Sequence, residues 1–132
     1  MNQAKKKTPK LRYLAARGQE SFLQEKCVNW FRLKYMGESR LLFSIPNGGF
    51  RHPSVGAVMK REGMLRGVSD LLLLIPSRGY HGFCVEFKVG ENELSEEQVR
   101  FATNVIEWGY QYRVIRDFDN FIRLINWYLE KA

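Results

Sequence analysis

Cysteine is scarce in this chain of 132 residues, which contains only Cys27 and Cys84. Neither has a second cysteine or a histidine at the spacing of a metal site, which excludes a zinc-binding motif. Each lies among apolar residues, so we expect two reduced thiols in the core, with a disulfide between them as the alternative. The two histidines, His52 and His81, are not predicted zinc ligands, although His81 lies beside a predicted turn where substrate contact is possible.

Long apolar runs are also missing. No run approaches the ~18 residues of a membrane-spanning helix, so we expect no membrane partner. The first ten residues, MNQAKKKTPK, are basic and lead into no apolar segment of the signal-peptide type. No repeat or low-complexity linker divides the chain, and its length suggests one domain. We place that domain at residues 19–132, after a basic and flexible arm at residues 1–18.

Basic side chains outnumber acidic ones, at 21 against 14, for a net charge of +7. An excess of Lys and Arg in a small domain favours a polyanionic partner, because these cations displace the counterions of a phosphate backbone. The alternative is an ordinary basic domain that binds no nucleic acid.

Glycines and prolines separate the segments with regular hydrophobic spacing. A capping box at Ser95 and Gln98 marks one helix start, and Asp117 or Asp119 caps the last helix. The predicted order is α-β-α-β-β-α-β-α, which indicates an α/β fold with a mixed four-stranded sheet flanked by helices. The helices are predicted at 19–36, 53–63, 95–108 and 117–129, and the strands at 41–45, 71–75, 83–88 and 110–115.

Two carboxylates and an amine lie in the hairpin of the second and third predicted strands. If Ile75 pairs with Phe83, Asp70 lies opposite Lys88 and becomes a diagonal neighbour of Glu86 on one face of the sheet. Carboxylates at that separation can share one cation, with oxygen ligands about 2.0–2.1 Å from Mg²⁺. The prediction depends on the register, because a slip of one residue would turn the side chains to the other face.

A structural interpretation of the same residues is also open. Asp70 could simply follow a turn, and Glu86 with Lys88 could be a solvent-facing pair on an edge strand. The apolar strand after Asp70 favours an interior position, where a carboxylate needs a cation or hydrogen-bond donors. Gly67, just before it, would let a large ligand approach closely.

The motifs follow one another in a specific order from about residue 19 to 115. Asp70 followed by Glu86-Phe87-Lys88 resembles the PD-(D/E)XK, restriction-endonuclease-like nuclease core. More narrowly, the chain resembles the VRR-NUC family (virus-type replication-repair nucleases), which includes stand-alone phage nucleases and a domain of a DNA-crosslink repair nuclease. One departure is Ser69, where a proline often precedes the aspartate. The matching pieces are Glu20 with Gln24, Ile45-Pro46-Asn47-Gly48-Gly49, Gly63, Gly67-Val68-Ser69-Asp70-Leu71, Tyr80-His81-Gly82, Val85-Glu86-Phe87-Lys88 and Leu94-Ser95-Glu96-Glu97-Gln98.

The resemblance implies phosphodiester hydrolysis assisted by Mg²⁺ or Mn²⁺. Asp70, Glu86 and the backbone carbonyl of Phe87 would hold the metal through hard oxygen atoms. Lys88 would orient the attacking water or stabilise charge that develops on the phosphate.

Two further residues have a structural and a catalytic interpretation. Glu20 shares a helix face with Gln24 and is a predicted additional metal ligand, directly or through water. Its alternative role is a helix-start carboxylate that interacts with the macrodipole. For Gln98 we favour the capping role over a catalytic one, although the resemblance also puts it near the site.

The segment from Pro46 to Arg66 is the predicted DNA-facing loop and helix. Its glycines expose backbone N–H groups that suit phosphate, and its cations share one stretch of the chain. Ordinary surface solvation is the alternative for each cation. The predicted DNA-binding residues are Asn47, Gly48, Gly49, Arg51, Lys60, Arg61 and Arg66.

The resemblance therefore implies a structure-selective DNA endonuclease, acting on branched DNA such as four-way (Holliday) junctions in DNA repair. A homodimer is expected, because paired sites suit a symmetric junction. The expected location is the cytoplasm of a bacterial or phage-infected cell. Two alternatives remain: a flap or nicking nuclease without junction preference, and a DNA-binding module that has lost catalysis. The second is disfavoured because Asp70, Glu86 and Lys88 are all present.

Overall fold

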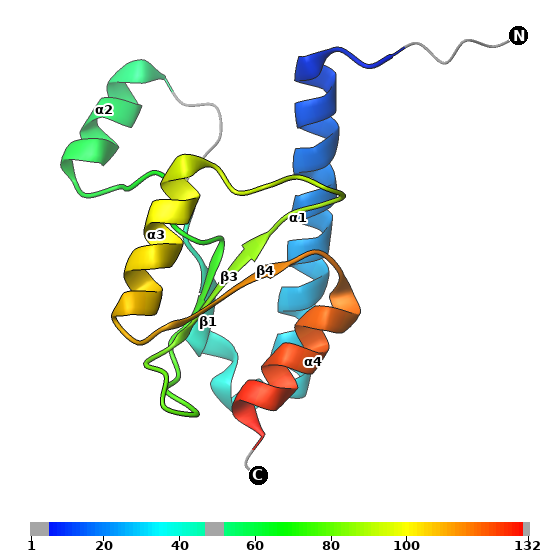
Figure 1. Ribbon diagram of the computed structural model, residues 1–132, viewed down its shortest axis with the longest axis vertical. Coiled ribbons are helices and arrows are strands. Elements are labelled where there is room, and N and C mark those ends of the chain that lie inside the picture. The colour runs from blue at the N-terminus through cyan, green and yellow to red at the C-terminus, as the bar shows by residue number, and fades with distance from the viewer. Residues whose placement is uncertain (1–5, 47–51, 131–132) are drawn as a thin grey trace, which may run out of the picture.

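The computed structural model describes residues 6–46 and 52–130 and contains one sheet (Figure 1). The sheet order is β1-β2-β3-β4. β1 and β2 pair antiparallel, as do β2 and β3, whereas β3 and β4 run parallel. This is the predicted mixed four-stranded sheet. Its strands are β1 (Leu42–Ser44), β2 (Leu71–Leu73), β3 (Phe83–Phe87) and β4 (Gln111–Ile115).

In the described residues, four α-helices and one 3₁₀-helix accompany the sheet, and the predicted order of helices and strands is confirmed. The 3₁₀-helix between α1 and β1 was not predicted. No helix within the described ranges is both long enough and apolar enough to cross a bilayer. The helices are α1 (Pro9–Lys34), η1 (Met36–Leu41), α2 (Pro53–Arg61), α3 (Glu96–Glu107) and α4 (Phe118–Leu129).

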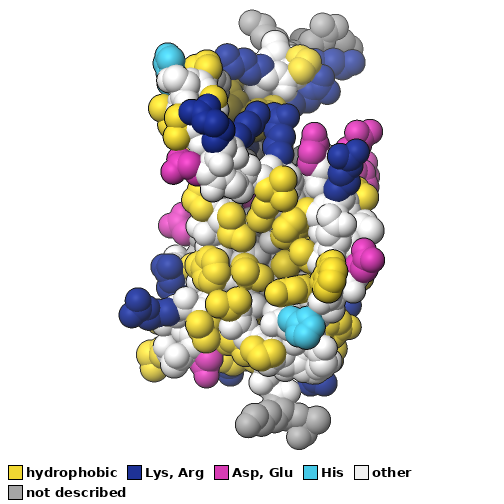
Figure 2. All heavy atoms as spheres, turned by 90° about the vertical axis from the view of Figure 1, so that its left-hand side faces the viewer, with side chains coloured by type: hydrophobic (Ala, Val, Ile, Leu, Met, Phe, Trp, Pro, Cys, Tyr) yellow, Lys and Arg dark blue, Asp and Glu magenta, His cyan; other side chains and the backbone are white. Residues whose placement is uncertain are grey.

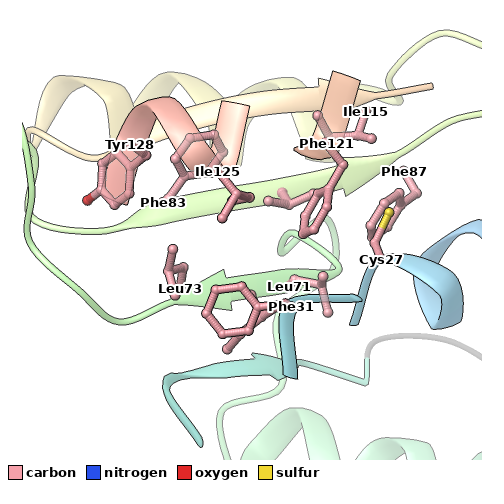
Figure 3. Close-up of a cluster of buried hydrophobic side chains, with 12 residues drawn as sticks. Cys27, Phe31, Leu71, Leu73, Phe83, Phe87, Ile115, Phe121, Ile125 and Tyr128 are labelled. Atoms are coloured by element: carbon pink, nitrogen blue, oxygen red, sulfur yellow. The ribbon is translucent and has the colours of Figure 1, made fainter. Parts of the chain in front are cut away.

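The main core lies between one face of the sheet and helices α1 and α4 (Figure 3). Alternate residues of β3 point into it, as the two-residue period of a strand requires. Cys27 of α1 is buried in this core, and both cysteines are free thiols, as expected. The buried side chains include Cys27, Phe31, Leu71, Leu73, Phe83, Val85, Phe87, Ile115, Phe121, Ile125 and Tyr128.

A smaller cluster lies on the side of the sheet that carries α3. Cys84 of β3, Ala102 of α3 and Tyr112 of β4 are buried together there. The hydroxyl of Tyr112 is buried and has no hydrogen-bond partner among the described residues. The two clusters hold β3 between two layers of helices, so all five residues of this strand are buried.

Helix α1 begins earlier than predicted. Thr8 caps it, since its Oγ1 accepts a hydrogen bond of 3.2 Å from the backbone N–H of Leu11, and Pro9 occupies the first turn. The part of the predicted arm from Pro9 to residue 18 is therefore helical. The hydrophobic spacing did not reveal these turns because they pack against little. Phe22 of α1 is 71% exposed and does not take part in the core.

The β2–β3 register differs from the predicted one by two residues. Phe83 pairs with Leu73 rather than with Ile75, because the connection between the strands is longer than the assumed turn. A shift of two residues keeps every side chain on its predicted face. Extended by one position, the observed register puts Asp70 directly opposite Glu86, which corrects the predicted diagonal arrangement.

Candidate active site

Asp70 and Glu86 meet where β2 begins and β3 ends. The backbone N–H of Asp70 donates to Glu86 Oε2 at 3.2 Å, and the backbone N–H of Phe87 donates to Asp70 Oδ2 at 2.8 Å. Each carboxylate is thus held by the backbone of the opposite strand. These reciprocal bonds fix the two side chains close together on one face of the sheet.

Gln98 connects this pair to the start of α3. Its side-chain Nε2 donates to Glu86 Oε1 at 2.7 Å. Its Oε1 accepts from the backbone N–H of Ser95 at 2.9 Å, while Ser95 Oγ accepts from the Gln98 N–H at 3.3 Å. The predicted capping box is confirmed, and the same amide also orients Glu86. A catalytic role for Gln98 stays a prediction.

Gly67 brings the loop before Asp70 against the first turn of α3. It has φ +89°, and a Cβ at this position would lie 2.4 Å from the carbonyl carbon of Glu97 and 2.8 Å from the backbone nitrogen of Gln98. The expected close approach of a ligand was therefore wrong, because the backbone of α3 occupies that space. Only a residue without a side chain lets Asp70 and Gln98 converge on Glu86.

Burial and mutual repulsion work against the ionised form of the carboxylate pair. Glu86 is only 3% exposed, and this burial, with the nearby Asp70 carboxylate, raises the pKa of Glu86 to about 8. Burial also raises the pKa of Asp70, although the Phe87 N–H and the positive charges of Arg17 and Lys88 act to lower it. Two close carboxylates that resist ionisation together favour a bound cation.

Glu20 and Lys88 lie at the edge of this site. Burial raises the pKa of the half-buried Glu20, the Lys88 ammonium lowers it and the Asp70 carboxylate raises it. The field of Arg17 also lowers the pKa of Glu20. The predictions missed Arg17, because it was assigned to the flexible arm. Its position one helical turn before Glu20 was the signal that could have revealed it.

The donor set fits a hard divalent cation. Asp70 and Glu86 present carboxylate oxygens, and each such oxygen has two lone pairs, so the hydrogen bonds leave coordination capacity. Within the described residues, no three or more His, Cys, Asp or Glu side chains gather as a metal-binding group. The structure therefore brings Asp70 and Glu86 together but does not add Glu20 to them, and metal binding by all three stays a prediction.

Part of the predicted DNA-facing segment can be located. Lys60 and Arg61 are exposed at the end of α2, a helix without buried residues, and Arg66 is exposed after it. His52 caps α2, since its Nδ1 accepts from the backbone N–H of Ser54 at 3.3 Å. Four predicted residues, Asn47, Gly48, Gly49 and Arg51, lie outside the described residues.

His81 has a structural environment. Its ring packs edge-on against Tyr110, with 5.7 Å between the ring centroids, and its backbone N–H donates to the Gly109 carbonyl at 2.9 Å. Gly109 has φ +87°, and a Cβ there would lie 2.8 Å from the His81 ring. Nothing in these contacts directs His81 toward Asp70 and Glu86, and its contact with substrate stays a prediction.

The side of the molecule that carries α2 and α3 is partly apolar (Figure 2). A hollow of about 340 Å³ lies between α3 and the sheet. Trp108 at its edge is 75% exposed. Apolar side chains gather across the middle of this face, and the hollow is lined mainly by Leu72, Phe101, Val105, Trp108 and Tyr110.

Comparisons with known proteins agree at the level of the fold. None of the protein-family models matches the sequence, and none of the curated proteins does. Among solved structures, the chain is similar to one named "VRR_NUC domain protein", with a TM-score of 0.72. The sequences are 24% identical, and the match covers 83% of this chain and 87% of that chain. The chain therefore has the fold of a VRR_NUC domain, as its motifs predicted.

Proposed function

We propose that this protein is a metal-dependent endodeoxyribonuclease of the VRR-NUC type that cleaves branched DNA, with four-way junctions as the preferred substrate. The observation that carries the proposal is the pair of Asp70 and the buried Glu86, each held by the other strand's backbone. Lys88 lies two residues after Glu86, just past the end of β3. This is the Glu-x-Lys spacing of a PD-(D/E)XK nuclease site. The fold shared with a VRR_NUC domain protein supports the same reaction.

Each residue has a defined task in the proposed reaction. Asp70, Glu86 and the Phe87 carbonyl would hold Mg²⁺ or Mn²⁺, which when bound supplies charge neutralisation at the scissile phosphate and acidifies bound water. Gln98 keeps Glu86 in position through its bond to Oε1. Lys88 orients the water and stabilises negative charge on the phosphate. Glu20 adds a carboxylate at the edge of the site.

DNA binding is assigned to the basic residues on and after α2. Lys60, Arg61 and Arg66 are exposed and lie on or after α2. Because phosphate contacts release counterions, affinity should fall steeply as the salt concentration rises. A homodimer would present two sites to the two symmetric strands of a junction.

A nuclease that acts on flaps or nicks is the second candidate, and a binding module without catalysis is the third. The intact Asp70, Glu86 and Lys88 argue against the third. A panel of labelled substrates separates the first two, since they differ only in the DNA structure that is cut.

The test is a cleavage assay on junction, flap, fork and linear DNA, with Mn²⁺, with Mg²⁺ or with chelator. We expect metal-dependent cutting that is fastest on the junction. Replacing Asp70, Glu86 or Lys88 by alanine should lower the rate at least about 100-fold. DNA binding, measured in chelator, should persist in these variants because the phosphate contacts remain.

Glu107→Ala is the matched control, since it removes an exposed carboxylate at the far end of α3. It should cut at the wild-type rate. Cleavage that continues in chelator, or full activity of Glu86→Ala, would defeat the proposed reaction. Equal rates on all four substrates would be compatible with the proposed reaction but would contradict the preference for junctions.

A further inference from the structure

The N-terminal half of α1 carries charge that its own helix does not need. Its first turn contains no acidic residue, and no Asp or Glu precedes Glu20 anywhere in the sequence. Lys10 and Arg12 therefore lie near the positive end of the helix macrodipole, where cations are unfavourable, and Arg17 adds a third cation further along the helix. A basic helix start without compensating carboxylates suggests that an external anion supplies the missing negative charge.

This part of α1 also extends away from the core. Figure 1 shows the N-terminal turns of α1 reaching beyond the sheet, and the buried residues of the helix, Cys27 and Phe31, both lie in its second half. Lys10, Tyr13 and Arg17 are exposed. Packing against the domain therefore does not account for a helix of this length.

The exposed cations continue the active-site face of the helix. Lys10, Tyr13, Arg17, Glu20 and Gln24 follow one another at steps of three and four, so they form one stripe along α1. At its inner end this stripe reaches the catalytic carboxylates, because the charge of Arg17 acts on both Asp70 and Glu20.

A groove of about 250 Å³ lies between α1 and the segment after Lys88, on a face of the helix other than the stripe. It is bounded by Arg12 and Gln19 from the helix and by Gly90, Glu91 and Asn92 from the loop. Arg116 fixes this loop, since its Nη1 donates to the Gly90 carbonyl at 2.9 Å. The loop therefore packs beside another face of α1 and leaves Lys10, Tyr13 and Arg17 exposed.

We propose that the N-terminal half of α1 is a DNA-binding arm, in which the stripe of Lys10, Tyr13 and Arg17 holds the phosphates of the DNA that flanks the cleavage site. The inference rests on the proposed nuclease function and adds a second basic element to α2. A helix rises 1.5 Å per residue, so Lys10 lies about 15 Å along α1 from Glu20. That length corresponds to about four base pairs of flanking duplex.

The test compares two double variants that each lose two cations from α1. Lys10→Ala/Arg17→Ala removes the stripe, whereas Arg32→Ala/Lys34→Ala removes exposed cations from the last turn. Affinity for labelled junction and linear DNA is measured in chelator at several salt concentrations. The stripe variant should bind about tenfold more weakly and lose about two from the salt slope, and the last-turn variant should match the wild type.

Substrate length gives a second measurement. Shortening the duplex flank stepwise should weaken wild-type binding once the flank is less than about four base pairs long. The stripe variant should be insensitive to this shortening. Its melting temperature should stay close to that of the wild type, because both side chains are exposed.

Equal affinities and salt slopes of the two variants would overturn the proposal that this half of α1 binds DNA. So would a stripe-dependent binding to vesicles of anionic phospholipid with unchanged DNA affinity. If the wild type cuts DNA and the variants bind alike, the arm fails while the nuclease assignment stands. If the wild type binds but never cuts, the nuclease assignment fails while the comparison of variants still decides the arm. An absence of DNA binding by the wild type would overturn both.

Discussion

At the scale of single residues, the candidate site depends on side chains that serve structure and chemistry together. Gln98 is the clearest case, since one amide closes the capping box of α3 and also donates to Glu86 Oε1 at 2.7 Å. Residues that orient a metal-binding carboxylate commonly affect metal affinity or activity by about 10–100-fold. Ser95 belongs to the same capping box, but its two hydrogen bonds in that box join it to Gln98 and not to Glu86.

This difference allows the two roles of Gln98 to be separated. Gln98→Ala and Ser95→Ala should each lower the free energy of unfolding by about 1 kcal/mol, since both break the cap. Only Gln98→Ala should also lower the cleavage rate, by about 10–100-fold. Chemical denaturation and single-turnover cleavage measure the two effects. Equal activity of the two variants would mean that the bond to Glu86 has no catalytic importance.

At the scale of elements, the site is assembled by the contact between the loop before β2 and the first turn of α3. Gly67 makes this contact possible, with a positive φ and no space for a Cβ. Gly63, a few residues earlier in the same loop, also has a positive φ of 110° but nothing within 4 Å of its Cβ position. Substitution of Gly63 therefore tests backbone strain alone, whereas substitution of Gly67 tests strain together with steric overlap.

Gly67→Ala should lower the free energy of unfolding by about 2–4 kcal/mol, through the left-handed backbone and the overlap with α3. Gly63→Ala should cost only about 1 kcal/mol, because strain alone applies there. Urea denaturation of both variants provides the measurement. A Gly67→Ala protein as stable as Gly63→Ala would show that the loop can move away from α3 at little cost.

The sequence predicted the elements better than their edges and pairing. The capping box, the buried apolar strands and the closing helix were visible, because each has a local signal in residue type or spacing. The start of α1 was missed because its first turns face solvent and show no hydrophobic period. The pairing of Phe83 was misjudged because the length of an irregular connection has no such signal. Asp70 and Glu86 were still placed on one face, because a shift of two residues preserves the face, but they lie directly opposite each other rather than diagonally.

The approach of Gln98 to the site was expected only from the family resemblance, and that of Arg17 was not predicted. Both contacts depend on how helices sit against the ends of the strands, which is a property of tertiary packing. Gln98 lies 12 residues after Glu86 in the chain, and no local pattern fixes that return. The predicted roles of Asn47, Gly48, Gly49 and Arg51 stay predictions, as do the metal-binding roles.

At the scale of the whole molecule, the apolar face beside α3 is the surface most suited to the proposed homodimer. Monomeric proteins rarely expose large contiguous apolar surfaces without a use for them. The hollow of about 340 Å³ is bordered by Trp108, which is 75% exposed. A two-fold contact would bury the same surface of both copies.

The wild type should therefore behave as a dimer at micromolar concentration in sedimentation equilibrium, and Trp108→Asp should be monomeric. Leu33→Asp is the matched control, because Leu33 is 78% exposed on α1 and does not border the hollow. It should leave the dimer intact. A monomeric wild type would exclude the homodimer, and a dimeric Trp108→Asp would exclude this surface as the interface.

The central claim is that Asp70 and Glu86 together hold a divalent cation. Titration calorimetry with Mn²⁺ tests it independently of any activity, on the wild type and on the double variant Asp70→Asn/Glu86→Gln. These isosteric changes remove the charges and keep the shape of the site. We predict that the wild type binds Mn²⁺ and that the double variant binds it at least tenfold more weakly. Equal binding of Mn²⁺ by the two proteins would contradict the claim.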